Sequence, residues 1–190
     1  MNTTIGLVCR FKPLHLGHAV MLKAACRLSA QVKIGVGSAN RYDRRNPFTF
    51  EETAAMLAAY LAPRFSNWEV VRVDDLGHGP RWRAMVSELF GELGLFVSAN
   101  DYVRELMGSV YPLAHPLELI PDEDRVPVDG TSVRRALARG EDWRRLVPPE
   151  TADFLAERGL PERFRREFGL ETLALEASRA AEEVDRVLLG

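Results

Sequence analysis

Short apolar runs alternate with longer helical patterns along most of this chain, and the alternation limits the folds that it can adopt. Apolar runs cover residues 4–9, 32–37, 69–73, 95–98 and 117–120, and helical patterns cover 17–29, 49–61, the region 82–93 and a short stretch from Asp101. Runs this short suit strands that are covered on both faces. The order predicts an α/β fold with a doubly wound parallel sheet.

The turn between the first strand and the first helix concentrates polar groups at a helix start. A helix start leaves backbone N–H groups free and carries the positive end of the dipole, so it attracts anions. His15 and His18 add side-chain donors, and Gly17 has no Cβ to keep a base or ribose away from the backbone. We expect a phosphate site here, at the carboxyl end of a strand. A metal site is less favoured, because two imidazoles without a nearby Cys or carboxylate leave a zinc shell incomplete.

A second turn-to-helix start, at residues 129–137, is rich in hydroxyl and guanidinium groups and is a second candidate phosphate clamp. By contrast, Thr49 and Glu52 fit a capping box, which is a structural device.

Composition limits the remaining possibilities. The 190 residues are 46% apolar, enough for one core, and we expect a main domain at 1–168 and a C-terminal helix at 169–190. A net charge of -2 argues against a general nucleic-acid binder, and no stretch has the apolar length of a membrane span. Cys9 and Cys26 fall in a strand and a helix pattern, so we expect no disulfide framework and a cytoplasmic protein.

The C-terminal stretch shows an apolar seam with alternating steps of three and four residues. Packing within the same chain or assembly is favoured over an extended coiled coil, because alanine specifies a seam weakly. The seam consists of Leu170, Leu173, Ala177, Ala180, Val184 and Val187.

The segment 9–18, Cys-Arg-Phe-Lys-Pro-Leu-His-Leu-Gly-His, resembles the GRFxPxHxGH signature of the nucleotidylyltransferase superfamily. Thr131–Arg134 stands where that family has its late TxxR signature. Between them, 37–40, 45–49, Asp75 with Trp82, and 98–100 look like the archaeal-type nicotinamide-mononucleotide adenylyltransferases. The resemblance covers about residues 4 to 160 and implies a Rossmann-like sheet of the nucleotidylyltransferase type.

The family resemblance implies that the phosphate of nicotinamide mononucleotide attacks the α-phosphorus of ATP, giving NAD and pyrophosphate. Such a reaction needs positioning and charge stabilisation and no protein nucleophile. Mg²⁺ would arrive with ATP, without a metal site of the protein's own. The resemblance also implies a homo-oligomer, and from the net charge and the lack of a membrane span we expect no nucleic-acid or membrane partner.

By resemblance, His15, His18, Arg10 and Arg134 form the catalytic set, with His18 nearest the α-phosphate and Arg134 on the outer phosphates. Trp82 would stack on the pyridine ring, although from the residues alone it could equally fill the core. The remaining expected binding residues are Phe11, Lys12, Gly17, Arg45, Asn100, Thr131 and Ser132.

The chain departs from the family pattern at several positions. Lys12 stands where Gln or Met is common and could add a phosphate contact, while Asp129 replaces a Ser and could cap a helix. Other departures are Cys9 for Gly, Gly79 for Asn, and Ala99 and Asp101 for Gly and Pro. Because the later changes cluster on the acceptor side, cytidylyl transfer to a phosphorylated alcohol and adenylyl transfer to phosphopantetheine stay open. A non-catalytic nucleotide-binding regulatory module is an alternative of another class, against which intact His15, His18 and Arg134 argue.

Overall fold

A computed structural model describes residues 3–178 of the chain. Five strands form one sheet in the order β3-β2-β1-β4-β5, and every neighbouring pair is parallel. The strands are β1 Thr4–Cys9, β2 Gln31–Val36, β3 Trp68–Arg72, β4 Leu95–Val97 and β5 Leu113–Ala114. The predicted doubly wound parallel sheet is confirmed.

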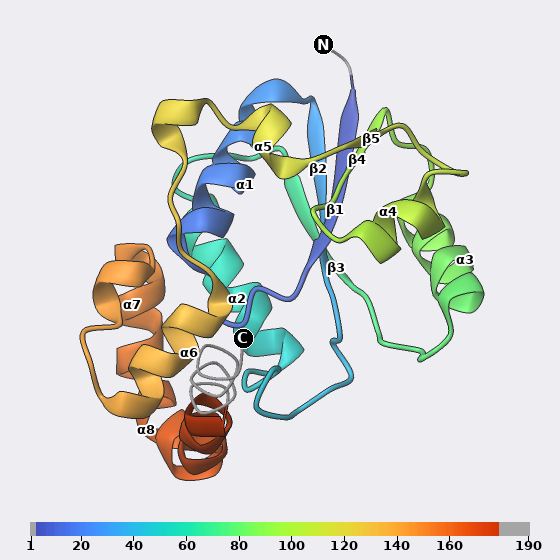
Figure 1. Cartoon of the computed structure of the whole chain (residues 1–190). Coiled ribbons are helices and arrows are strands. Elements are labelled where there is room, and N and C mark those ends of the chain that lie inside the picture. The colour runs from blue at the N-terminus through green and yellow to red at the C-terminus, as the bar shows by residue number, and fades with distance from the viewer. Residues whose placement is uncertain (1–2, 179–190) are drawn as a thin grey trace, which may run out of the picture.

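Helices connect the strands and continue beyond the last one (Figure 1). They are α1 Leu16–Leu28, α2 Phe50–Leu61, α3 Gly79–Phe90, α4 Asp101–Met107, α5 Pro116–Leu119, α6 Gly130–Arg139, α7 Pro149–Glu157 and α8 Leu160–Phe164. Local chemistry sets several boundaries: Thr49 and Glu52 form the predicted capping box at the start of α2. No helix within residues 3–178 is long and apolar enough to cross a membrane.

The order in which strands are added to the sheet reverses at β1, although all strands run parallel. This strand lies between β2, which follows it through α1, and β4, which the chain reaches only after β3 and α3. Ligands of doubly wound sheets bind beyond the carboxyl ends of the strands at such a point. The segments that follow Cys9 and Val97 therefore lie where a ligand is expected.

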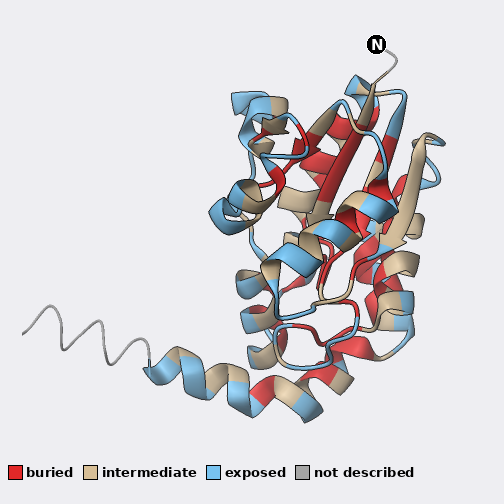
Figure 2. Ribbon diagram, turned by 90° about the vertical axis from the view of Figure 1, so that its right-hand side faces the viewer, coloured by how far each residue is buried: buried red, intermediate tan, exposed pale blue. Residues whose placement is uncertain are grey.

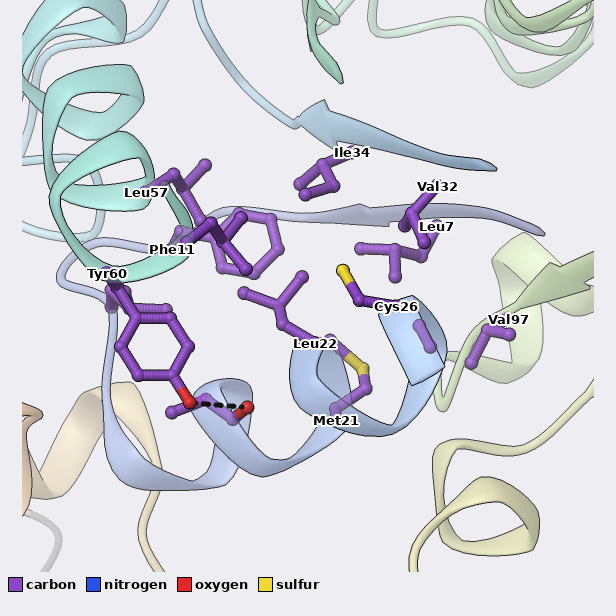
Figure 3. Close-up of a cluster of buried hydrophobic side chains, with 14 of the residues drawn as sticks. Leu7, Phe11, Met21, Leu22, Cys26, Val32, Ile34, Leu57, Tyr60 and Val97 are labelled. Carbon is purple, nitrogen blue, oxygen red and sulfur yellow. Dashed lines mark hydrogen bonds between the residues drawn. The ribbon is translucent and has the colours of Figure 1, made fainter. Parts of the chain in front are cut away.

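Two apolar clusters cover the two faces of the sheet. On one face, side chains of α1 and α2, such as Leu22 and Leu57, pack against Leu7 and Ile34 (Figure 3). Within this cluster the Tyr60 hydroxyl donates to the Ala19 carbonyl at 3.2 Å, which satisfies a buried polar group. The other face is covered by α3 and α4. Figure 2 shows many of the buried residues, in red, along the strands between these two helical layers.

A third apolar cluster joins the C-terminal helices to α2. It contains Met56 from α2, Val133 and Leu137 from α6, and Leu155 and Phe164 from α7 and α8. Because α6 also carries the second candidate phosphate clamp, this cluster fixes the clamp relative to the sheet.

The strand predicted at 117–120 is wrong, because residues 116–119 form helix α5 and the strand lies earlier, at Leu113–Ala114. Pro116 at the helix start has a preset helical φ, and His115 accepts a hydrogen bond from the Leu117 N–H at 3.2 Å. Glu118 accepts in turn from the His115 N–H, which completes a capping box.

The chain is helical from Leu160 to residue 178, across the predicted boundary after residue 168, with a π-helical segment at Arg165–Gly169. Of the described seam residues, Leu170 is 86% exposed and Ala177 is exposed, and only Leu173 is half-buried, so the seam gives this helix little packing on the domain. Ion pairs hold this helix instead, from Glu171 to Arg44 and from Glu176 to Arg135. The seam residues Ala180, Val184 and Val187 lie outside the described residues.

Candidate nucleotide-binding site

A cavity of about 880 Å³ lies beyond the carboxyl ends of β1 and β4 and is called the main cleft below. Both candidate phosphate segments reach it: Arg134 on α6 donates from Nη1 to the Lys12 carbonyl at 3.0 Å. Of the residues predicted for the site, it is lined by Arg10, Phe11, Lys12, His15, His18, Trp82, Asn100, Thr131 and Arg134. Segments more than one hundred residues apart therefore meet at one cavity.

The turn after β1 is anchored in the core. Phe11 adopts a positive φ of 52°, which is unusual for a bulky side chain, and its ring is completely buried in the cluster of α1 and α2. The same ring lies 4.7 Å from the His18 ring, centroid to centroid. Phe11 thus couples the position of His18 to the core.

His15 and His18 form a stacked pair at the start of α1. Their ring centroids are 3.6 Å apart with an interplanar angle of 27°. His15 caps the helix, because its Nδ1 accepts a hydrogen bond from the His18 backbone N–H at 3.3 Å. A neutral imidazole that accepts at Nδ1 has its proton on Nε2, so His15 keeps one ring donor for a ligand.

Both histidines are neutral at pH 7. Burial lowers the pKa of His15 to about 4; the nearby Asp129 carboxylate opposes this shift in part, and Arg134 adds a smaller lowering effect. Burial followed by the neighbouring His15 and Arg10 lowers the pKa of His18 well below its usual 6.5. His18 Nδ1 is buried without a hydrogen-bond partner among the described residues. A bound anion would raise the pKa of His18 again, because a nearby negative charge favours the protonated ring.

Lys12 is almost completely buried at the base of the cleft, with a relative exposure of 2%. Its Nζ donates to the Ser38 carbonyl at 3.1 Å, which joins the turn after β1 to the turn after β2. Burial lowers the pKa of Lys12 to about 8, against the opposing effect of Asp43. The ammonium has three donors, so the site holds a largely desolvated cation with capacity for an anion.

Asp129 caps α6, as predicted from its position before Thr131. Its Oδ1 accepts from the Ser132 backbone N–H at 2.7 Å and from the Ser132 hydroxyl at 2.8 Å. Burial raises the pKa of Asp129, but these hydrogen bonds outweigh burial and the pKa is lowered. A carboxylate therefore stands at the rim of a cleft rich in cations, next to Arg134.

Arg134 is the guanidinium shared by both phosphate segments. Burial, then the like charges of Arg10 and Arg44, lower its pKa to about 10, so it is still charged at pH 7. Nη2 lies 3.4 Å from the Thr131 hydroxyl. Repulsion among these guanidinium groups favours a polyanionic ligand, which would relieve it.

The far end of the main cleft is formed by the starts of α3 and α4. Trp82 is half-buried, packs against the cluster on that face of the sheet and also lines the cleft. Its stacking on a pyridine ring stays a prediction. Asn100 caps α4 by accepting from the Val103 N–H at 3.1 Å through Oδ1, which leaves its NH₂ group as a donor. His78 caps α3 and lines the cleft as well.

Tyr102 contributes an aromatic wall that the sequence alone did not indicate. Its side chain is 59% exposed yet lines the main cleft on the same side as Trp82. A Cβ built on Gly79 would overlap the Tyr102 hydroxyl and would lie 3.1 Å from Leu106. The glycine found in place of an asparagine thus makes room for Tyr102.

Three residues predicted to bind the ligand line neither this cleft nor the smaller cavity described next: Gly17, Arg45 and Ser132. The space at Gly17 is taken by the chain, since a Cβ there would lie 2.7 Å from the Val128 carbonyl oxygen. The hydroxyl of Ser132 is bound to Asp129. Arg45 is exposed in the loop before α2, where its backbone N–H donates to Asp43.

A second cavity of about 280 Å³ adjoins the main cleft and is called the annex below. Thr131 and Arg134 line both cavities. The other annex residues are Arg44, Arg135, Thr172, Leu175 and Glu176. The apolar seam lies on the opposite side of the C-terminal helix, so the sequence did not predict that its polar side lines a cavity.

Within residues 3–178, no group of three or more His, Cys, Asp or Glu side chains is placed to hold a metal ion. Cys9 and Cys26 are both free, and burial raises the pKa of Cys9 to about 12, which makes it a poor thiolate ligand.

Comparisons with known proteins agree with this geometry. A cytidylyltransferase-like family model matches residues 7–136. A nicotinamide-nucleotide adenylyltransferase of Methanolobus tindarius is 30% identical over 149 residues, covering 78% of this chain and 84% of that protein. Another protein of that name, from Methanoculleus marisnigri, is 30% identical over 158 residues, covering 83% of this chain and 92% of that protein.

A bifunctional NMN adenylyltransferase/ADP ribose pyrophosphatase of Francisella tularensis has the same fold, with a TM-score of 0.76 at 16% sequence identity. The match covers 96% of this chain but 57% of that chain, so this protein spans little more than half of the bifunctional one. A second structure from the same organism, complexed with AMP and a manganese ion, has a TM-score of 0.73 at 17% identity.

Three observations lead to one assignment: the order of the strands, the convergence of the two signature segments and the match over residues 7–136. The chain belongs to the cytidylyltransferase-like family, and to that part of it whose archaeal members are named nicotinamide-nucleotide adenylyltransferases.

Proposed function

We propose that this protein transfers the adenylyl group of ATP to the phosphate of nicotinamide mononucleotide, producing NAD and pyrophosphate. The observation that supports this most strongly is the meeting of His15, His18 and Arg134 at one cleft whose other end bears aromatic side chains. The archaeal relatives named nicotinamide-nucleotide adenylyltransferases support the same choice of acceptor.

In this proposal, a phosphate oxygen of the mononucleotide attacks the α-phosphorus of ATP. The bond from the α-phosphorus to the bridging oxygen breaks, and the electron pair leaves with pyrophosphate. The residues act by binding and orienting the phosphates: neutral His15 and His18 donate hydrogen bonds, and Lys12 and Arg134 offset the negative charge. Interactions that strengthen as charge develops accelerate the reaction.

The acceptor would lie toward α3 and α4. Trp82 offers a flat apolar face for a pyridine ring, and the free NH₂ group of Asn100 is a donor for the ring's carboxamide oxygen. Arg10, which lines the cleft between the two ends, would bring the two phosphate-bearing substrates together. Arg45 has a place in this proposal only if its loop moves toward the cleft when substrates bind.

Mg²⁺ belongs to this proposal as the ion that accompanies ATP. Magnesium commonly retains water and phosphate ligands rather than an all-protein cage. The arginine-rich walls around Arg134 suit the phosphates themselves, and the nearby carboxylates are already engaged, Asp129 with Ser132 and Glu176 with Arg135. The related Francisella protein was solved with AMP and a manganese ion, which supports a divalent metal in such sites.

A screen for pyrophosphate release tests the proposal. ATP and CTP are each combined with nicotinamide mononucleotide, nicotinate mononucleotide and phosphopantetheine, because the family model is named for cytidylyl transfer. We expect the highest kcat/KM with ATP and nicotinamide mononucleotide. Preference for CTP or for phosphopantetheine would replace the proposed reaction by one of the alternatives, and no turnover with any pair would favour a regulatory module.

We also propose that the protein works in the cytoplasm as a homo-oligomer without nucleic-acid partners. The exposed Leu170 on the C-terminal helix supports a contact between copies. Size-exclusion chromatography with light scattering tests this directly, and a monomer at all accessible concentrations would contradict it.

A further inference from the structure

The annex has the size and the charge of a phosphate subsite. Three guanidinium groups, from Arg44, Arg134 and Arg135, line its volume of about 280 Å³ together with the hydroxyl-bearing side chains of Thr131 and Thr172. The one carboxylate in the lining, Glu176, is itself bound to Arg135 at 2.7 Å and also to a guanidinium outside the lining. Even with this carboxylate, the lining has a formal charge of about +2, because three arginines face one glutamate.

The annex is adjacent to the outer-phosphate end of the main cleft. Thr131 and Arg134 form a wall common to both cavities. A triphosphate whose inner phosphate lies near His18 would extend toward Arg134, and the annex is the cationic space next to it. Its opposite wall comes from the C-terminal helix, through Thr172 and Glu176.

Contacts beside the annex hold the C-terminal helix and the loop before α2 together. Arg44 Nε lies 3.2 Å from Glu171 Oε1, and Tyr42 donates a short hydrogen bond to Glu167. The Tyr42 ring also packs edge-on against Phe168 at 5.4 Å. Arg44 is therefore directed by the helix and is not an unconstrained surface side chain, since its exposure is 20%.

We propose that the annex binds the terminal phosphate of the nucleoside triphosphate, and the pyrophosphate formed from it, so that the C-terminal helix completes the triphosphate site. Arg44 would contact the phosphate, and Glu171 would be a positioning residue that orients Arg44. The inference rests on the proposed function for the identity of the nucleotide, but it concerns binding of phosphates alone.

Calorimetric titration with ATP, AMP and inorganic pyrophosphate tests the annex, because AMP lacks the two outer phosphates. For Arg44→Gln we expect ATP and pyrophosphate to bind about tenfold more weakly and AMP to bind within about twofold of the wild type. Thr172→Glu places a negative charge in the annex and should weaken ATP similarly, whereas the neutral Thr172→Gln should do so less. Ala174→Glu adds the same charge to an exposed position of the same helix and is the matched control.

The outcomes separate the two proposals. Unchanged ATP affinity in Arg44→Gln and Thr172→Glu would overturn the annex proposal, as would equal weakening by Thr172→Glu and Ala174→Glu. Equal loss of ATP and AMP affinity would also overturn it, because the effect would then not depend on the outer phosphates. Since the acceptor, nicotinamide mononucleotide, is not present in these titrations, failure of the pyrophosphate-release screen would leave their interpretation unaffected. The Thr172 pair remains informative if Arg44→Gln fails to fold.

Discussion

His15 and His18 stack with ring centroids 3.6 Å apart, and the Nδ1 atom of His15 accepts a hydrogen bond from the backbone of His18. Protonating both rings would place two positive charges within stacking distance in a buried site. The free protein therefore presents neutral donors to a nucleotide, and the negative charge of the phosphates raises the tendency of the pair to take up a proton. The His18 ring also lies 4.7 Å from the buried ring of Phe11, centroid to centroid.

Replacing His18 by alanine should lower kcat by a factor of about one hundred to one thousand, the loss typical of one transition-state donor. The affinity for ATP should fall far less, because the contact of His18 strengthens as charge develops at the reacting phosphorus. Single-turnover kinetics and calorimetric titration of ATP measure the two effects separately. An unchanged kcat would remove His18 from the chemistry, and a circular-dichroism melt controls for loss of the stacked pair.

Stability should fall when the pH is lowered from about 7 to about 5. The pKa of His15 is about 4 in the folded protein against 6.5 ordinarily, so between these values the unfolded state binds more protons. The cost for His15 alone is about 2 kcal/mol at about pH 5. Asp129 does not cause this loss, because its lowered pKa matters only below its ordinary 3.8.

Urea denaturation of the wild type and of His15→Asn at both pH values measures this effect of protonation. Asparagine is a good helix cap and does not titrate, so the variant should lose about 2 kcal/mol less than the wild type on acidification. Equal losses in the two proteins would show that His15 is not the group responsible.

Two substitutions at Asp129 should separate its effect on ATP binding from its effect on stability. Asp129→Asn keeps an acceptor for the Ser132 N–H while removing a negative charge at the cleft, so ATP should bind a few-fold more tightly. Asp129→Ala loses the cap of α6 and should lower the free energy of unfolding by about 1 kcal/mol. Denaturant melts and ATP titrations of both variants decide the matter. Weaker ATP binding by the asparagine variant would mean that the carboxylate itself serves the nucleotide.

Gly79→Ala should displace the Tyr102 ring, because the added Cβ overlaps the hydroxyl of that tyrosine. The expected result is a higher KM for the mononucleotide with little change in the KM for ATP. Tyr102→Phe removes the overlapping oxygen. The KM of the double variant for the mononucleotide should therefore be lower than the value expected from adding the effects of the two single substitutions. Strict additivity in this cycle would mean that the two residues act independently at the acceptor end.

The sheet was predictable because its information is local. The apolar runs at residues 4–9 and 32–37, each followed by a helical pattern, are sufficient to predict a parallel arrangement, and the structure confirms it. The run at 117–120 misled because its apolar residues follow Pro116, which starts a helix as readily as it interrupts a strand. Four residues are too few for periodicity to distinguish the two.

The sequence could predict the motif residues of the candidate site, but not the other side chains that line its cavities. His15, His18 and Arg134 belong to segments with recognisable helix starts, whereas Tyr102 and Thr172 line the cavities only through tertiary packing. Gly17 is the opposite case, because its missing Cβ makes room for the Val128 carbonyl and it lines neither described cavity. The periodicity of the C-terminal helix predicted that Leu170 lies in a packing seam, but Leu170 is exposed. The contacts with the domain come instead from polar residues such as Glu171, which pairs with Arg44.

A crystal structure with a non-hydrolysable ATP analogue tests the central claim most directly. We predict that its triphosphate lies in the main cleft, with the inner phosphate within hydrogen-bonding distance of His18 and the outer phosphates against Arg134. A triphosphate bound elsewhere, or one that contacts only the segment after β1 and leaves Arg134 bound to Lys12 alone, would contradict the account.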